Sequence, residues 1–364
     1  MKKHAARLIF LVAASALAQQ LPQVQLSHTT EGLRGVSVVS RQIAWASGTH
    51  GTYLRTIDAG RTWTPSQVPG AESLDFRAVI AFDANQAFLM SSGLGDLSRI
   101  YHTSDAGVHW KLQFTNSIPK GFFDSMAFWD RAHGIALGDP VPDDTGHLKF
   151  ELLQTTDGET WTPIPPSQLP PAVEGEGAFA ASNSSLAILP SDSNLWFATG
   201  GRVARVFHSP DRGRTWQIFD TPITHGPDSA GIFSIFFRDP LHGVIAGGDY
   251  KHPDRDADNL AFTNDGGKTW TVSPIRPQAF FSAVAYARTR PLRGKDKNRN
   301  LDDDQANSRI FLAGPKFIFD FRPPQDPTRI SPEKKSPVQF NAISPYPEGG
   351  VLVVGPNGTI ASLP

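Results

Sequence analysis

Short apolar runs alternate with polar turns along most of the chain. Three of the clearest stretches are FRAVIAFDANQAFLMSSG (76–93), FDSMAFWDRAHGIALG (123–138) and IFSIFFRDPLHGVIAGG (232–248). In each, an apolar run, a polar turn and a second run ending in glycine follow one another. A third run then leads into a box that contains Asp and Trp, and a fourth follows the Trp. Runs of this length bounded by turn residues are typical of β-strands. The pattern therefore predicts repeated units of four antiparallel strands.

The box recurs five times at a nearly constant interval. Its copies are TIDAGRTW (56–63), TSDAGVHW (103–110), TTDGETW (155–161), SPDRGRTW (209–216) and TNDGGKTW (263–270). The successive aspartates of these boxes are 47, 52, 54 and 54 residues apart. Four strands per unit of about 50 residues are the signature of a β-propeller blade.

Seven units can be counted from their first apolar runs. The units start near Leu33, Phe76, Phe123, Phe179, Ile232, Phe281 and Phe340. The seventh runs out of sequence after three strands, and PQVQLSH (22–28) precedes the first unit without a unit of its own. We therefore predict an all-β fold over residues 19–364, a seven-bladed propeller of four-stranded antiparallel blades, with an insertion at 288–308 in the sixth blade. The N-terminal strand is expected to close the last blade, which removes a free sheet edge.

The box residues suit a turn between the third and fourth strands better than an active site. The Asp carboxylate and the preceding Ser or Thr can accept hydrogen bonds from N–H groups of the turn. The glycine supplies a positive φ, and the Trp is a large apolar plate for packing. Five copies around a ring cannot all form one catalytic centre. The third box is one residue shorter, with Glu159 near the usual glycine position, so a tighter or shifted turn is expected there. The residues given this structural role are Asp58, Gly60, Trp63, Asp105, Gly107, Trp110, Asp157, Trp161, Asp211, Gly213, Trp216, Asp265, Gly267 and Trp270.

The first 18 residues predict a secretory signal peptide. A basic stretch with Lys2, Lys3 and Arg7 precedes the apolar run LIFLVAASALA, and cleavage is expected near Ala18. No later run has the length of a transmembrane helix. We therefore expect an exported protein without a membrane anchor, either periplasmic or secreted. Zero cysteines exclude disulfides and thiolate metal sites. Loss of the three basic residues moves the net charge from −1 to −4, which argues against nucleic acid as a partner.

Candidate binding residues gather in loops that we expect on the face opposite the boxes. These loops are GDPVPDDTGH in the third unit, PPAVEGEGAFAASN between the third and fourth, and GGDYKHPDRDADN in the fifth. If the loops converge, Asp139, Glu176 and Asp249 are candidates for acid–base catalysis on a glycoside, or for binding Ca²⁺. The plainer interpretation is that they are ordinary loop residues. The residues predicted for a ligand or partner surface are Asp139, Asp143, Asp144, Glu174, Glu176, Asp249, Tyr250, Lys251 and Asp254.

A second acidic stretch, KDKNRNLDDDQ (295–305), fails as a calcium loop. Asp296, Asn298 and Asn300 have suitable spacing, but Leu301 stands where the loop needs glycine and Asn307 where it needs a bidentate Glu. The sequence also contains no G-x-S-x-G, P-loop or H-E-x-x-H motif. We therefore expect no metal site and no cofactor, with Ca²⁺ at the acidic loops as the alternative.

The five boxes resemble Asp-box (BNR) repeats, which fit the pattern S/T-x-D-x-G-x-T-W. Such repeats occur in sialidases, tandem-propeller xyloglucanases, sortilin-type receptors and the photosystem II stability/assembly factor family. A single exported chain of seven units most resembles the last of these, over roughly residues 27–364. This resemblance implies a non-catalytic scaffold that binds a protein partner, and the partner would be a membrane-protein assembly intermediate. We expect the chain to be a monomer.

Two other functions remain open. The first is a secreted glycoside hydrolase of the sialidase type. Sialidases carry an R-I/L-P motif near the first blade and a Tyr–Glu pair, whereas GLRGVS (32–37) holds Arg34 without that motif, and Tyr250 lies beside Lys251 and His252. The second is a cofactor-binding redox propeller. Quinone-dependent dehydrogenases of that kind usually have eight blades with different Trp motifs, and many have adjacent cysteines, which this chain lacks.

Overall fold

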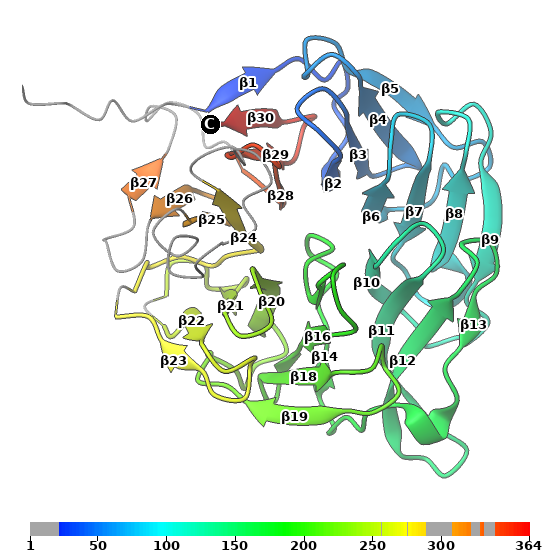
Figure 1. The fold of residues 1–364 in the computed structure, drawn as a ribbon. Coiled ribbons are helices and arrows are strands. Elements are labelled where there is room, and N and C mark those ends of the chain that lie inside the picture. Colours follow the sequence, from blue (N-terminus) through cyan, green and yellow to red (C-terminus); the bar gives the residue numbers. More distant parts are fainter. Residues whose placement is uncertain (1–21, 256, 275, 289–307, 322–327, 331–338) are drawn as a thin grey trace, which may run out of the picture.

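The protein is a closed ring of seven β-sheets (Figure 1). The computed structural model describes residues 22–255, 257–274, 276–288, 308–321, 328–330 and 339–364. The predicted signal peptide and most of the predicted insertion in blade 6 lie outside the described residues. Apart from the strands, the described part of the chain has two short 3-10 helices, η1 (Gly95–Leu97) and η2 (Pro166–Gln168). No helix in these ranges is both long and apolar enough to span a bilayer.

The first three blades each contain four antiparallel strands in sequence order, as predicted. Blade 1 consists of β2 (Leu33–Val38), β3 (Ala44–Gly48), β4 (Thr52–Thr56) and β5 (Thr64–Gln67). Blade 2 consists of β6 (Phe76–Ala81), β7 (Ala87–Ser91), β8 (Arg99–Thr103) and β9 (Lys111–Thr115). Blade 3 consists of β10 (Phe123–Phe128), β11 (Gly134–Pro142), β12 (Leu148–Thr155) and β13 (Thr162–Pro163).

Blades 4 to 6 continue the same order, with one addition to blade 5. Blade 4 consists of β15 (Leu186–Ile188), β16 (Leu195–Ala198), β18 (Arg205–Ser209) and β19 (Gln217–Asp220). Blade 5 consists of β20 (Ala230–Phe237), β21 (Gly243–Asp249), β22 (Leu260–Thr263) and β23 (Thr271–Val272), and it is extended by β17 (Gly200–Gly201) and β14 (Glu176–Gly177). Blade 6 consists of β24 (Ala283–Arg288), β25 (Ser308–Ala313), β26 (Ile318–Phe321) and β27 (Thr328–Ile330).

The inner strand of blade 4 begins later than the sequence predicts. It starts at Leu186 rather than near Phe179. Just before this stretch, β14 joins the sheet of blade 5 through β17, and Phe179 itself stacks on Phe233 of that blade. The apolar character of this stretch therefore serves packing across the ring rather than a strand of its own blade.

The N-terminal strand closes the ring, which confirms the prediction. Blade 7 consists of β28 (Ala342–Pro345), β29 (Val351–Val354), β30 (Ile360–Leu363) and β1 (Gln23–Gln25). The first strand pairs antiparallel with the last, and Val24 lies opposite Ala361 (Figure 1). Trp63 Nε1 of blade 1 also donates a hydrogen bond to Gln25 Oε1 at 2.8 Å. The strand that completes blade 7 is thereby tied to blade 1.

The five boxes form the turns between the third and fourth strands of blades 1 to 5, and each aspartate accepts hydrogen bonds from its own turn. In the last box, Asp265 Oδ1 accepts the N–H groups of Lys268 and Thr269, both at 3.0 Å. In the third box, the glycine directly follows the aspartate: Gly158 has a φ of 73° and its N–H donates to Thr155 Oγ1. This turn is shorter, as expected.

Each box tryptophan belongs to the apolar cluster between its own blade and the preceding one. Trp270 of blade 5, for example, shares a buried cluster with Trp196 of blade 4 and meets Phe237 edge-on at 6.1 Å. Seven such clusters lie around the ring and form the core. The repeat therefore packs blade against blade, and the box belongs to this packing.

Candidate functional site

The topology separates the box turns from the loops that carry the candidate residues. Box turns and the loops between first and second strands lie at one end of each blade. The loops between second and third strands, and the connections between blades, lie at the other end. We call this second end the connection face. All nine residues predicted for a ligand or partner surface belong to it or to the strand ends beneath it.

A short segment crosses the mouth of the central channel on the connection face. Residues Ala178–Ser185, here called the strap, precede blade 4 and hydrogen-bond to other blades. Ser182 Oγ donates to the carbonyl oxygen of Ser282 before blade 6 at 2.7 Å. Asn183 Oδ1 accepts the N–H of Met126 in blade 3 at 2.7 Å. Because these contacts lie on opposite sides of the ring, the strap crosses its centre.

Two further serines of the strap bond to inner strands. Ser184 Oγ donates to Ser234 Oγ in blade 5 at 2.7 Å, and Ser185 Oγ lies 2.6 Å from Ser125 Oγ in blade 3. Ser125, Ser185 and Ser234 are fully buried. The strap is thus held by buried hydrogen bonds, which are costly to leave unmade.

Asp139, one of the predicted residues, anchors the strap to blade 3. It lies on β11, and its Oδ1 accepts the N–H of Ala178 at 3.0 Å. Burial raises the pKa of Asp139 to about 6, although the bond from Ala178 opposes the shift. A carboxyl group in this range can change its protonation near neutral pH.

Asp124 is a functional candidate that the sequence analysis missed. It lies within the apolar run of β10, is 1% exposed, and its Oδ2 has no hydrogen-bond partner among the described residues. Burial, and next the charge of Asp139, raise its pKa well above the usual range, while Arg77 opposes the shift. The signal was present in FDSMAFW (123–129), where one aspartate interrupts an apolar strand.

Asp124 occupies a position that is irregular in several blades. The inner strands of blades 1, 2, 3 and 5 each carry a register shift at one residue, which is Arg34, Arg77, Asp124 or Phe233. A bulge of this kind bends the strand and re-aims its side chain. The repeat therefore presents a different side chain at the same place in successive blades.

The bulge residues of blades 1 and 2 form a chain of ionic contacts toward the strap. Arg77 Nε lies 2.9 Å from Asp75 Oδ2, and Arg34 Nε lies 3.6 Å from Asp75 Oδ1. Arg77 Nη1 also donates to the carbonyl oxygen of Ala180 in the strap at 3.2 Å. The side chains of Arg34 and Arg77 remain 36% and 29% exposed. This half of the mouth is therefore charged and partly open to solvent.

The opposite half of the mouth is aromatic. Phe179 of the strap stacks on Phe233 with ring centres 3.7 Å apart, and Phe233 meets Phe280 edge-on at 4.6 Å. Tyr250 packs against the edge of this group and is 49% exposed. Tyr250, the one aromatic residue predicted for the partner surface, thus lies at the exposed edge of this aromatic group.

Glu176 is engaged in a buried ion pair. Its Oε1 accepts Thr199 Oγ1 at 2.7 Å and Arg205 Nε at 2.9 Å, and its side chain is fully buried. The pair fastens β14 to blade 4. Both carboxylate oxygens have donors, since Arg205 Nη2 also contacts Oε2. Glu174, two residues earlier, is exposed.

Asp249 and Asp143 stabilise their own turns. Asp249 Oδ1 accepts the N–H of Lys251 at 3.0 Å, and its Oδ2 lies 2.8 Å from His252 Nδ1. Burial alone would raise the pKa of Asp249, but these bonds outweigh it and the pKa is lowered. Asp143 accepts the Oγ1 and N–H of Thr145, which lower its pKa. Three further predicted residues are exposed: Asp144, Lys251 and Asp254.

The three predicted catalytic carboxylates therefore bond to separate partners instead of sharing a catalytic arrangement. Asp139 bonds to the strap, Glu176 to Arg205, and Asp249 to its own turn. The pair that does come together is Asp124 with Asp139. In the described ranges, no cluster of three or more His, Asp or Glu side chains is arranged to hold a metal ion. The residues of the rejected calcium loop, Asp296, Asn298 and Asn300, lie outside those ranges.

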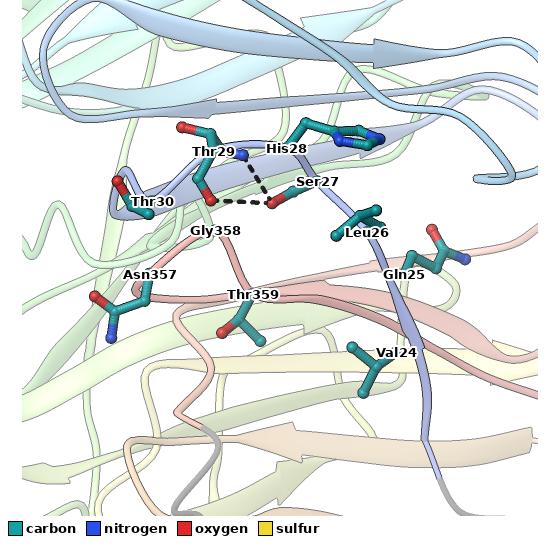
Figure 2. Close-up of a pocket in the computed structure, with 10 residues that line it drawn as sticks. All are labelled: Val24, Gln25, Leu26, Ser27, His28, Thr29, Thr30, Asn357, Gly358 and Thr359. Atoms are coloured by element: carbon teal, nitrogen blue, oxygen red, sulfur yellow. Dashed lines mark hydrogen bonds between the residues drawn. The ribbon is translucent and has the colours of Figure 1, made fainter.

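A wide hollow lies away from this mouth, where the closing strand meets blade 7 (Figure 2). It measures about 720 Å³ and lies between residues 24–30 and the turn 357–359. Val24 and Leu26 are 70% and 69% exposed on it, and Ser27 Oγ bonds within the segment to Thr29. His28 is its only ionisable side chain. Most of the other described residues that line it are polar but uncharged.

Comparison with known proteins gives two relatives of different function. A sialidase from Bacteroides fragilis (strain YCH46) is 25% identical over 256 residues, covering 66% of this chain and 41% of the relative. The chloroplastic photosystem II stability/assembly factor HCF136 from Arabidopsis thaliana is 26% identical over 265 residues, covering 61% of this chain and 62% of the relative. The chain thus matches less than two thirds of either relative's length. No family model matches the chain.

Solved structures confirm the architecture. The structure of YCF48 bound to D1 peptide superposes with a TM-score of 0.61 at 15% identity, over 95% of this chain and 96% of that one. A virginiamycin B lyase from Staphylococcus aureus superposes with a TM-score of 0.62 at 12% identity, over 94% and 98%. Since a lyase matches as well as a peptide-bound protein, these likenesses establish the fold alone. The chain is a seven-bladed β-propeller that resembles the photosystem II stability/assembly factors and also the sialidases.

Proposed function

We propose that this protein is an exported, monomeric, non-catalytic scaffold whose connection face binds a protein partner, and that the partner is a membrane-protein assembly intermediate. The observation that carries this proposal is the strap. By bonding to blades 3, 5 and 6 it crosses the mouth of the channel. A mouth crossed by a fixed segment favours recognition of a surface over entry of a small substrate.

The two halves of the mouth suit a polypeptide that carries both polar and apolar groups. Arg34 and Arg77 present partly exposed guanidinium groups, which bind carboxylates and carbonyl oxygens with defined geometry. Tyr250 presents an exposed ring on a rigid aromatic base. Tyrosine and arginine are enriched among the residues that dominate protein–protein binding.

The relatives support the same proposal. One of the two relatives is a photosystem II stability/assembly factor, and a protein with the same fold has been solved with a peptide bound. For this chain, the class of partner remains part of the proposal. The predicted signal peptide supports export, which places partner binding in the periplasm or the medium.

The proposal predicts that substitutions on the connection face reduce partner recovery. We expect Tyr250→Ala combined with Arg34→Ala to lower recovery of a membrane-protein partner about tenfold or more, because both side chains are exposed there. Cross-linking of the exported fraction followed by mass spectrometry measures this. Val108→Ala, at a 72% exposed position in the second box, is the matched control and should leave recovery unchanged. Equal recovery with both variants, or no partner with the wild-type protein, would contradict the proposal.

The carboxyl pair keeps a glycoside hydrolase as the second candidate. Asp124 and Asp139 both have raised pKa values, as a general acid requires. Against this, Asp124 is 1% exposed and Asp139 Oδ1 is bonded to the strap, so the pair has no open position for a sugar. We expect no hydrolysis of aryl glycosides above the uncatalysed rate. Turnover that disappears in Asp139→Asn would instead establish the hydrolase.

A further inference from the structure

A narrow cleft between blades 2 and 3 is distinct from the channel mouth. It measures about 220 Å³ and opens between the end of β9, the β11–β12 hairpin and the chain around η2. Its walls are mainly apolar and include Phe114, Ile118, Val141, Leu152, Ile164 and Leu169. Leu152 and Ile164 of its wall also belong to the apolar cluster that packs Trp216 and Ala178, so the cleft adjoins the packing between blades 3 and 4.

The most deeply buried charged group in the wall of the cleft is Glu151 on β12. The residue is 6% exposed, and Asn116 Nδ2 donates to its Oε2 at 2.9 Å. Asn116 is itself held, since its Oδ1 accepts the N–H of Ile118 at 2.9 Å. Among the described residues, Glu151 Oε1 receives no hydrogen bond. One carboxylate oxygen is therefore fixed, and the other is accessible from the cleft rather than sealed in the wall.

The local backbone leaves room for this carboxyl. A Cβ on Gly121 would lie 2.8 Å from Glu151 Oε2 and 2.4 Å from Asn116 Nδ2. Burial raises the pKa of Glu151, and the bond from Asn116 opposes the shift. Burying a carboxylate is costly unless it is paired. A cationic group bound in the cleft would supply the missing partner.

Most of the charged residues around the cleft are acidic, which also favours a bound cation. Asp143 and Asp144 line it together with Glu151, and Lys149 is the one basic residue among its lining groups. We propose that this cleft binds one basic side chain, lysine or arginine, of a polypeptide partner, with the cationic head at Glu151 and the apolar stem along the cleft walls. That the basic side chain belongs to a polypeptide partner rests on the proposed function. The preference of the cleft for a cation does not depend on it.

The size of the cleft agrees with one side chain. Pockets for drug-sized molecules span about 300–1,000 Å³, and this cleft is smaller. Lysine and arginine also carry apolar stems that pack along apolar surface while the head stays with polar groups. Phe114 lies in the same wall and can contact a cation through its ring.

The test uses n-hexylammonium as a probe, with hexan-1-ol and hexanoate as comparisons of similar length. Methyl NMR of the full chain follows the signals of Ile118, Val141 and Leu152 during titration at pH 7. We expect saturable shifts with n-hexylammonium, weaker shifts with hexan-1-ol, and none with hexanoate. Glu151→Gln keeps the shape and should weaken n-hexylammonium binding about tenfold, the effect of losing one charged hydrogen bond.

Two variants keep the test decisive. Glu159→Gln makes the same change in a box turn, where Glu159 contacts Lys111, and should leave binding unchanged. Lys149→Ala removes the competing cation and should tighten n-hexylammonium binding several-fold, which tests the charge argument even if Glu151→Gln fails to fold. Equal affinity for n-hexylammonium and hexan-1-ol, or unchanged binding in Lys149→Ala and Glu151→Gln, would overturn the proposal.

A second titration, with amino-acid amides as probes, tests separately whether the basic group can belong to a polypeptide. N-acetyl-lysine N-methylamide should shift the same methyl signals, and N-acetyl-norleucine N-methylamide should not. If partner recovery persists in Glu151→Gln while the lysine probe fails to bind, the cleft proposal is wrong and the scaffold proposal stands. If the probe binds but no partner is recovered, the cleft chemistry stands and the scaffold proposal is wrong.

Discussion

Both faces of the ring carry aspartates whose own turns lower their pKa values, but among the described aspartates the raised pKa values belong to Asp124 and Asp139 on the connection face. In the box turns, Asp105 and Asp157 have pKa values lowered to about 2, first by the backbone N–H groups of His109 and Thr160. On the connection face, burial raises the pKa of Asp139 to about 6. The comparison teaches that residue type does not reveal a functional carboxyl, whereas its donors and its burial do.

The box aspartates and Asp139 also differ in how far along the sequence their hydrogen-bond partners lie. A box aspartate bonds to residues within four positions of itself, as Asp265 does with Thr269. Asp139 instead bonds 39 residues away, to Ala178 in the strap. Local bonds make a turn that can be repeated in several blades. Long-range bonds make an arrangement that occurs once, which is what a specific binding face requires.

The largest effect that we expect comes from a substitution in a box turn. Trp63 is 2% exposed and bonds to Gln25 of the closing strand, so Trp63→Ala removes both packing and the tie across the ring. The free energy of unfolding should fall by about 3–5 kcal/mol. Denaturant titration measures this, and Val108→Ala, exposed in the next box, should change it by less than about 0.5 kcal/mol. A loss below about 1 kcal/mol in Trp63→Ala would mean that the box is not part of the core.

The next effect concerns the connection face. Burial raises the pKa of Asp139 from its ordinary value of 3.8 to about 6, so its ionisation destabilises the fold as pH rises between these values. Asp139→Asn removes this ionisation, and the amide oxygen of the asparagine can still accept the N–H of Ala178. Relative to wild type, its stability should therefore rise between about pH 4 and pH 6, by up to about 3 kcal/mol.

The groups facing Asp139 affect how this experiment is interpreted. Asp124 and Arg77 lie in the same charged half of the mouth, and the strap supplies the N–H of Ala178. Asp144→Asn, at an exposed position of the same blade, is the control and should give a flat difference curve. A flat curve for Asp139→Asn as well would show that the strap does not bury this carboxyl.

The smallest effect has the opposite sign. The pKa of Asp157 is lowered from its ordinary value of 3.8 to about 2. The carboxylate therefore stabilises the fold fully above pH 3.8, and this contribution is lost as pH falls through 2. Asp157→Asn should therefore lower the denaturation midpoint at pH 7 and have no effect near pH 2. A midpoint that is unchanged at pH 7 would mean that the turn does not need the charge.

The sequence predicts the architecture well because the repeat is local. The box spacing, the four strands per unit and the closing strand all follow from short patterns, and so does the tighter third turn. The late start of blade 4 could not be read in this way. Phe179 belongs to an apolar stretch like the others, but in the structure it stacks on Phe233 of the next blade instead of starting a strand.

The candidate site was predicted less completely, for a related reason. Asp139, Glu176 and Asp249 lie at the connection face, but their partners could not be seen in the sequence. Glu176 finds Arg205 at a distance of 29 residues in sequence, and Asp139 finds the strap. Asp124 and Glu151 were missed because each looks like a single polar position in an apolar strand. Their raised pKa values depend on burial by segments distant in sequence.

The central claim is that the connection face binds a partner while the box face stabilises the ring. Lysine-specific cross-linking of the protein with its partner, read by mass spectrometry, tests this most directly. The chain offers exposed lysines on both faces, with Lys120, Lys251 and Lys316 on the connection face and Lys111 and Lys268 beside the boxes. We predict cross-links to the first three. Cross-links concentrated on Lys111 and Lys268 would contradict the account.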